Sequence, residues 1–139
     1  MDRGALEQRV VDTLRGQDGV IAAYLFGSLA AGRAHRDSDV DVAVLLDRNA
    51  YPEAAGRFEV RLRLAAALGR ALGRNDVDLV IVNDVPPHLA RVIVLDGRRL
   101  LVTDAEAEHA FRRETMLRAA DLEPFLRRTR KRKLDLLTR

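Results

Sequence analysis

The chain has 139 residues, of which 47% are hydrophobic and 32% are charged. This length and balance are typical of one globular domain with a buried core, and they exclude a disordered chain. Cysteine is absent, which excludes disulfide bonds, cysteine zinc sites and thiol nucleophiles. Any bound metal must therefore have oxygen or imidazole ligands.

The charge is unevenly distributed along the chain. The net charge at pH 7 is +3, but the last 13 residues contain seven lysines and arginines and one acid, Asp135. The tail therefore carries +6, and the first 126 residues carry −3. A basic tail can contact phosphate groups or an acidic partner, and it can equally be the solvated end of a helix. If it contacts nucleic acid, we expect a weak interaction that falls steeply with salt.

The sequence does not predict contact with a membrane. The longest stretch without a charged residue has 14 residues, from Gly19 to Gly32, whereas a membrane-spanning helix needs about 20. Asp2 and Arg3 lead directly into a charged amphipathic segment, which differs from a secretory signal. We therefore expect a cytoplasmic protein.

Hydrophobic periodicity and turn residues predict a regular order of helices and strands. In chain order, these elements are a helix over residues 4–15, strands over 20–26 and 39–46, a helix over 52–72, a strand over 77–82, a helix that ends near 97, a strand over 98–102 and a helix from about 105. A turn-rich connection over residues 27–38 joins the first two strands. Pro124 is expected to kink or restart the last helix, whose basic segment runs to Leu137.

Two details of these elements are specific enough to compare with a structure. In the helix over residues 52–72, one apolar face is predicted to be buried, and its members are Phe58, Leu62, Ala65, Leu68 and Leu72. Asn83 and Asp84 are expected to cap the next helix, which Pro86 or Pro87 opens. Asp104 is expected to cap the last helix.

The order of the elements predicts an α/β (α+β) fold, in which a small mixed β-sheet is flanked by helices and followed by a C-terminal helical segment. No internal repeat and no low-complexity linker divides the sequence. We therefore expect a single domain over residues 1–139, with a basic helical tail at about residues 125–139.

Three aspartates are the main candidates for chemistry. Asp39 and Asp41 are separated by one residue at the start of a strand, so their side chains lie on the same face. Two like charges at the edge of a buried strand repel each other and need a compensating cation. Asp78 is second in the next apolar strand and can reach the same edge; Asp76 takes that place if the register slips. Carboxylates without nearby histidine or cysteine favour Mg²⁺ or Mn²⁺ over Zn²⁺.

A second candidate feature lies upstream, where Gly27 and Ser28 end the first strand and open a turn. Glycine permits a close approach of the backbone, free amides can face an anion, and the serine hydroxyl can donate to it. The sequence therefore offers a phosphate-binding turn followed by a carboxylate metal pair. A magnesium-bound triphosphate would satisfy both.

Together these residues form a known pattern. Gly27 and Ser28, ten further residues and Asp39-Val40-Asp41 fit GS-x10-D-x-D, which resembles the signature of the DNA polymerase β-type nucleotidyltransferase superfamily. The segment LFGSLAAGRAHRDSDVDVAVLL (residues 25–46) and the later segment DVDLVIVND are similar to the minimal nucleotidyltransferases. Specifically, they resemble the MntA-type antitoxins of HEPN/MNT toxin–antitoxin pairs. The likeness covers nearly the whole chain.

The resemblance implies the nucleotidyltransferase fold and a role for each aspartate. The implied reaction is the transfer of a nucleoside monophosphate from a nucleoside triphosphate to a hydroxyl, with two metal ions. Asp39 and Asp41 would hold the two Mg²⁺ ions, for which Mn²⁺ can substitute. Asp78 would bind the catalytic metal and orient or deprotonate the attacking hydroxyl.

The resemblance also implies a nucleotide and a partner. ATP would be the co-substrate, Gly27 and Ser28 would grip its β- and γ-phosphates, and Ser38 would be a further nucleotide contact. In the antitoxin group, the acceptor is a tyrosine of the partner HEPN toxin, a ribonuclease that AMPylation silences. The implied activity is therefore that of a protein adenylyltransferase acting on a cognate HEPN toxin.

One departure from the pattern motivates other hypotheses. Relatives often read GSRARG across the turn, whereas residues 27–32 read GSLAAG here and both arginines are missing. Arg33 and Arg36 are candidates for the lost cation, although neither is aligned with the missing residues. A second hypothesis is thus an antitoxin that binds its toxin without catalysis and has a weakened nucleotide site. A third is a small-molecule nucleotidyltransferase that acts with a separately encoded subunit.

Overall fold

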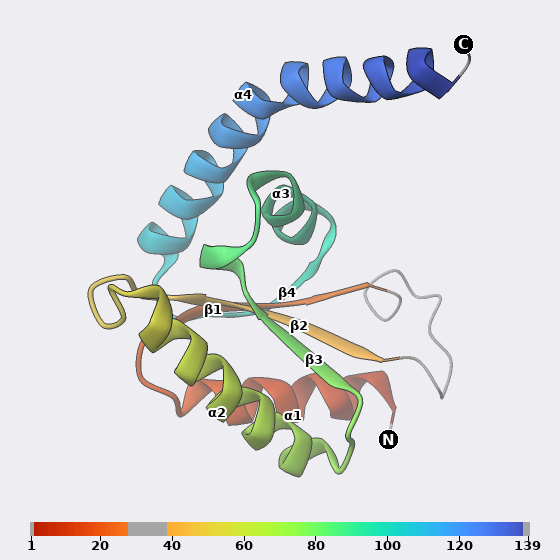
Figure 1. Ribbon diagram of the computed structural model, residues 1–139. Helices are drawn as coiled ribbons and strands as arrows, with labels where there is room; N and C mark the ends of the chain where they lie inside the picture. Colours follow the sequence, from red (N-terminus) through yellow and green to blue (C-terminus); the bar gives the residue numbers. More distant parts are fainter. Residues whose placement is uncertain (1, 28–38, 138–139) are drawn as a thin grey trace.

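The computed structural model describes residues 2–27 and 39–137, with the side chains of residues 2–27 and 39–121. Of the predicted site residues, Ser28 and Ser38 lie outside this part of the chain. The helices and strands (Figure 1) are, in chain order, α1 (Arg3–Arg15), β1 (Val20–Phe26), β2 (Val40–Leu46), α2 (Ala54–Leu72), β3 (Val77–Ile81), the short 3₁₀ helix η1 (Val82–Asp84), α3 (Pro87–Asp96), β4 (Arg98–Val102) and α4 (Ala105–Leu137).

The strands form one mixed sheet in the order β3-β2-β1-β4. β1 pairs antiparallel with both β2 and β4, whereas β2 pairs parallel with β3. Every predicted helix and strand is present, and most boundaries differ by no more than one or two residues. The predicted fold class, a mixed sheet flanked by helices, is confirmed. Because this pair is parallel, β2 and β3 begin at the same edge of the sheet, where Asp41 and Asp78 lie.

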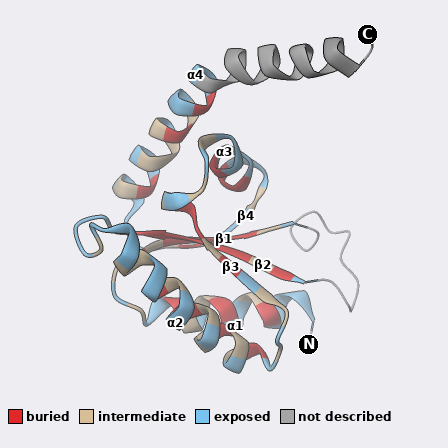
Figure 2. Ribbon diagram, in the orientation of Figure 1, coloured by how far each residue is buried: buried red, intermediate tan, exposed pale blue. Residues whose placement is uncertain are grey.

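The sheet is buried on both faces by helices (Figures 1 and 2). α1 and α2 cover one face, and α3 and the first half of α4 cover the other. The residues of β2 alternate between these two layers: Val40, Val42, Val44 and Leu46 join the cluster under α1 and α2, while Ala43 and Leu45 join the cluster under α3. The same two-residue period assigns Asp41 to the α3 side of the sheet.

The predicted buried face of α2 is wrong in part. The buried residues are Val60, Leu64, Leu68 and Leu72, while the side chains of Phe58 and Leu62 are 52% and 56% exposed. The reason is that Arg61 occupies a position that reaches the sheet, and Arg57, one turn earlier, reaches Asp84 of η1. Arg61 Nε donates to the carbonyl oxygen of Leu79 in the edge strand β3 at 2.7 Å. The apolar stripe that contains Phe58 and Leu62 is therefore rotated toward solvent.

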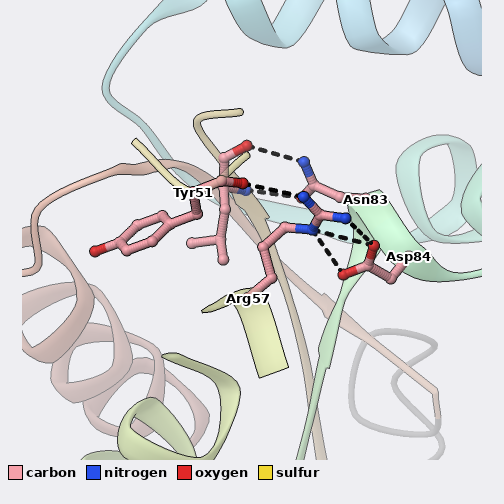
Figure 3. Close-up of polar contacts among 5 residues, drawn as sticks. Tyr51, Arg57, Asn83 and Asp84 are labelled. Atoms are coloured by element: carbon pink, nitrogen blue, oxygen red, sulfur yellow. Dashed lines mark hydrogen bonds and ion pairs between the residues drawn. The ribbon is translucent and has the colours of Figure 1, made fainter. Parts of the chain in front are cut away.

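Asn83 and Asp84 do not cap α3 as predicted; Pro86 occupies the N-cap position, without a side-chain cap. Instead, the Asn83 side chain binds the far end of β2, and the Asp84 side chain pairs with an arginine of α2 (Figure 3). Asn83 Oδ1 accepts from the N–H of Leu46 at 2.9 Å, and Asn83 Nδ2 donates to the carbonyl oxygen of Leu46 at 2.9 Å. Because the β2–β3 pairing stops at Val44 and Ile81, the Asn83 amide supplies the hydrogen bonds that a longer β3 would have made.

Asp84 pairs with an arginine of α2 in the same region (Figure 3). Arg57 Nη2 and Nε donate to the Asp84 carboxylate at 2.8–3.1 Å, and Arg57 Nη1 donates to the carbonyl oxygen of Tyr51 at 3.0 Å. Hydrogen bonding to Asp84 raises the pKa of Arg57, which stays charged. This arginine joins the segment before α2 to the turn after β3.

A buried carboxylate anchors α4 to the sheet. Glu108, which is 3% exposed, accepts from Tyr24 Oη at 2.8 Å and from Arg112 Nη1 at 3.2 Å, and it pairs with Arg99 Nη1 at 3.4 Å. Burial and the hydrogen bond to Glu108 raise the pKa of Tyr24, so its hydroxyl keeps its proton. The network connects the first turns of α4 to β1 and β4.

Asp104 caps α4 as predicted, since its Oδ1 accepts from the N–H of Ala107 at 3.1 Å. The helix continues through Pro124 to Leu137 without a break, so Pro124 does not restart it. Among the described residues, no helix combines the length and the apolar character that a membrane span requires.

Alanine substitutions of Leu64 and Leu62 test which face of α2 packs in the hydrophobic core. Leu64→Ala removes a fully buried side chain, so the free energy of unfolding should fall by about 2–5 kcal/mol. Leu62→Ala makes the same chemical change at a 56% exposed position, and its cost should stay within about 0.5 kcal/mol. Urea denaturation of the two variants measures the difference. Equal losses would show that both stripes of α2 are packed.

Candidate functional site

Three aspartates lie at the edge of the sheet where β2 and β3 begin. In the parallel pairing, Asp41 lies directly opposite Asp78, and Val40 lies opposite Val77. Asp39 immediately precedes β2. Asp39 and Asp78 are exposed, and Asp41 is half-buried. The predicted acidic residues are therefore brought together by the register of two neighbouring strands.

Of the three aspartates, Asp41 has the surroundings least favourable to a negative charge. Burial, followed by the negative charges of Asp78 and Asp39, raises the pKa of Asp41 above its ordinary value. Each of these effects disfavours the ionised carboxylate. A cation bound at this edge would favour the ionised form of Asp41, because its positive charge would compensate both the lost hydration and the repulsion.

Gly27 brings the backbone against the same carboxylate. It follows β1, in which Phe26 pairs with Asp41, and its φ of +73° is a conformation that favours glycine. A Cβ atom at this position would collide with Oδ2 of Asp41. The sequence predicts a close backbone approach at Gly27, and in the structure the group that it approaches is a carboxylate of the acidic cluster.

Asp76, the alternative third carboxylate, is engaged elsewhere. Its carboxylate accepts from Arg74 Nε at 2.7 Å and from Arg74 Nη2 at 2.6 Å. These hydrogen bonds lower the pKa of Asp76. Its carbonyl oxygen accepts from the N–H of Val40 at 3.0 Å, which helps to fix the register that puts Asp78 opposite Asp41. Sequence reasoning missed Arg74, for which the only signal was the Arg-x-Asp spacing before β3.

The donor set fits a hard divalent cation. Among residues 2–27 and 39–121, no three acidic or histidine side chains are close enough to enclose a metal ion by themselves. Mg²⁺ is commonly bound by one or two carboxylates together with substrate phosphates and water rather than by an all-protein cage. Asp39, Asp41 and Asp78 could hold such an ion in part, with a phosphate ligand completing its coordination.

A family comparison agrees with this geometry. The model of the family described as Polymerase beta, Nucleotidyltransferase matches residues 8–106. The chain belongs to this family. The match includes β1, β2 and β3, so it contains Gly27 and all three aspartates. The resemblance that the sequence motif indicated is thereby confirmed at the level of the nucleotidyltransferase family.

A curated nucleotidyltransferase is similar to this chain over part of its length. A curated relative, protein adenylyltransferase MntA of Shewanella oneidensis strain MR-1, is 38% identical over 89 residues, which are 61% of this chain and 56% of the relative. The chain thus aligns with little more than half of the length of that relative.

Solved structures match over almost the whole chain. The crystal structure of a toxin–antitoxin with AMP-PNP is 29% identical, has a TM-score of 0.66 and covers 96% of this chain and 98% of that chain. A structure of the tri-AMPylated Shewanella oneidensis HEPN toxin in complex with MNT antitoxin has a TM-score of 0.66 at 24% identity. The match covers 99% of this chain and 100% of that chain. At that identity it shows the fold alone.

Removing the Asp41 charge should stabilise the metal-free chain. The raised pKa of Asp41 means that the folded chain binds this proton more tightly than the unfolded chain does. The charged form therefore destabilises the fold at neutral pH, and the penalty disappears as the pH falls below the ordinary value of 3.8. In EDTA, Asp41→Asn should have a higher free energy of unfolding than the wild type at pH 7, and the difference should shrink on acidification.

Urea denaturation at a series of pH values measures this difference. Asp47→Asn, the same change at the opposite end of β2, controls for the general loss of a negative charge. A gap between Asp41→Asn and wild type that widens toward low pH would contradict the assignment of a repulsive, desolvated carboxylate.

Proposed function

We propose that this chain is the antitoxin of a HEPN/MNT toxin–antitoxin pair. It transfers AMP from ATP to a tyrosine hydroxyl of its cognate HEPN toxin in the cytoplasm, with Mg²⁺, and so neutralises the toxin. The observation that carries the proposal is the acidic edge, where Asp41 lies opposite Asp78 with Asp39 beside them and the backbone of Gly27 against Asp41. In this proposal, residues 1–139 form a single catalytic domain.

The comparisons support the proposed partner. The curated relative is a protein adenylyltransferase. Among the solved structures that match 96% or more of this chain are a toxin–antitoxin with AMP-PNP and a tri-AMPylated toxin in complex with its antitoxin. The sheet and its covering helices use most of this chain, which leaves one helical segment for binding an acceptor. Because so little of the chain is left to bind an acceptor, an acceptor hydroxyl presented by a partner protein fits this fold.

The chain's own residues would bind and orient the nucleotide. Asp39 and Asp41 are the residues that would hold Mg²⁺, and the backbone turn that starts at Gly27 would lie along the β- and γ-phosphates. When bound, Mg²⁺ would supply positive charge that offsets the charge of the triphosphate and of the departing pyrophosphate. Ser28 and Ser38 are proposed as further phosphate and nucleotide contacts.

Asp78 is proposed to act on the acceptor. Its exposed carboxylate accepts the proton of the tyrosine hydroxyl. The hydroxyl oxygen forms a bond to the α-phosphorus of ATP, and the bond from that phosphorus to the oxygen bridging to the β-phosphate breaks. Pyrophosphate leaves with the electron pair of the broken bond. The products are an AMP–tyrosine ester, pyrophosphate and a proton that Asp78 releases to water.

The basic tail has a secondary place in the proposal. Its seven basic residues are suited to an acidic surface of the partner. A weak, salt-sensitive contact with nucleic acid stays a prediction, since the side chains after residue 121 lie outside the described part of the chain.

The double variant Asp39→Asn/Asp41→Asn should abolish transfer while the fold is retained. Loss of two of the three candidate metal carboxylates removes several kcal/mol of charge stabilisation, so the rate should fall by at least about 1,000-fold. The measurement is the intact mass of the toxin after incubation with the chain, ATP and Mg²⁺, where each transfer adds one AMP unit. Asp47→Asn is the matched control and should keep full activity. Retained transfer by a folded double variant would refute the catalytic assignment.

The sequence of residues 27–32 favours a second candidate function. It has no basic residue, which is the feature expected of a weakened nucleotide site. The second candidate is an antitoxin that neutralises the toxin by binding alone. Growth of cells that express the toxin with the double variant separates the two: protection without any added AMP supports binding alone, and loss of protection supports catalysis.

A further inference from the structure

An apolar groove lies between the first turns of α2 and the last residues of β3. Its volume is about 660 Å³, which is in the range of protein pockets that bury a ligand group. The larger side chains that line it are Phe58, Val80 and Val85, together with the charged Arg61 and Asp84. The groove lies beside the edge strand, whose outer side has no strand neighbour.

The exposed apolar stripe of α2 continues this groove. Phe58 lines the groove and is 52% exposed, and Leu62, one turn further along the helix, is 56% exposed. Residues four apart lie on the same side of a helix, so the two side chains form one surface. Large exposed apolar side chains that border a groove are typical of an interaction site. The stripe that the sequence predicts to be core is therefore available to a partner.

Arg61 gives the groove a positive charge. Its Nε donates to the carbonyl oxygen of Leu79 at 2.7 Å, and this is its one hydrogen bond within the described part of the chain. The contact orients the guanidinium and leaves its remaining N–H donors for another acceptor. The charge of Asp84 is already compensated by Arg57 at 2.8 Å. The groove therefore suits an apolar group that is accompanied by a carboxylate, which a guanidinium binds well.

The groove also approaches the acidic edge. Val80 lines it and lies two residues after Asp78, so the two side chains share one face of β3. Asp78 is the aspartate proposed to act on the acceptor. A protein that presents its hydroxyl to Asp78 has to lie against the surfaces that border β3, and this groove is one of them.

We propose that the groove binds a segment of the acceptor protein in which an apolar side chain lies next to a carboxylate. The apolar side chain packs against Phe58 and Val80, and the carboxylate pairs with Arg61. The segment binds through its side chains, because a strand added along β3 would compete with Arg61 for the carbonyl oxygen of Leu79. The inference rests on the proposed function and adds the surface on which the cognate toxin docks.

Truncation of the apolar stripe tests the docking surface. Isothermal titration calorimetry of the full chain with the toxin, in EDTA and without nucleotide, measures binding in the absence of transfer. Phe58→Ala should weaken binding at least about 10-fold, as expected of a buried aromatic contact at an interface, and Leu62→Ala should weaken it in the same direction. Leu95→Ala, at a 48% exposed position of α3, is the matched control for Leu62→Ala and should bind like the wild type. In the transfer assay, Phe58→Ala should raise the KM for the toxin and leave kcat unchanged.

The charge of Arg61 is tested by the salt dependence of binding. Arg61→Gln should weaken toxin binding and make the affinity less sensitive to salt, because one ion pair is lost. Arg63→Gln is the matched control, since Arg63 is exposed and lies on another side of the helix. Weaker binding by Arg61→Gln with the salt dependence of the wild type would show that Arg61 acts only by supporting β3, and would overturn its pairing with a carboxylate.

Three further results would overturn the docking surface. Wild-type affinity in Phe58→Ala and Leu62→Ala, with AMP still added to the toxin, would overturn the inference and leave the proposed function intact. Self-association of the chain alone in analytical ultracentrifugation, abolished by Phe58→Ala, would assign the groove to a second copy of this chain. A wild-type chain that neither binds nor modifies the toxin would overturn the proposed function as well.

Discussion

The strand β2 is buried on both faces, and the chemistry of the molecule depends on that constraint. Alternate valines of β2 pack under α1 and α2, while the intervening residues face α3. A carboxylate on such a strand is tolerable only at its open end, where water or a bound cation can reach it. Asp41 lies at that end, opposite Asp78 on a strand that begins at the same edge. The hydrophobic core therefore decides where the charged groups lie, and it also makes them repel.

The edge strand β3 is held along its length by arginines. Arg74 pairs with Asp76 before the strand, Arg61 donates to a carbonyl oxygen within it, and Arg57 pairs with Asp84 after it. β3 has a strand neighbour on one side only, so these contacts replace part of what a second neighbour would provide. Since β3 carries Asp78, the arginines that support the strand also help to define the position of this carboxylate.

The sequence predicts local features well and long-range contacts poorly. β1 is predicted to the residue because Gly19 and Gly27 bound its apolar run, and the acidic pair follows from strand periodicity alone. Phe58 and Leu62 are misassigned because two apolar stripes overlap on α2, and the packing of the helix on the sheet, together with the contact of Arg61 with β3, sets which stripe is buried. Asn83 looks like a helix cap, whereas its role depends on β3 ending before β2 does. The choice of Asp78 over Asp76 likewise requires the register between two strands.

The contact between Gly27 and Asp41 couples two halves of the site that the sequence presents as separate motifs. The backbone at Gly27, where the proposed phosphate contact begins, lies against Asp41, a proposed cation ligand. If both ligands bind as proposed, a shift of either group on binding would displace the other. Under the proposed function, the affinities for cation and nucleotide would then be linked, and each ligand would change the binding of the other by the same factor. The chain would respond to a metal–nucleotide complex rather than to either ligand alone.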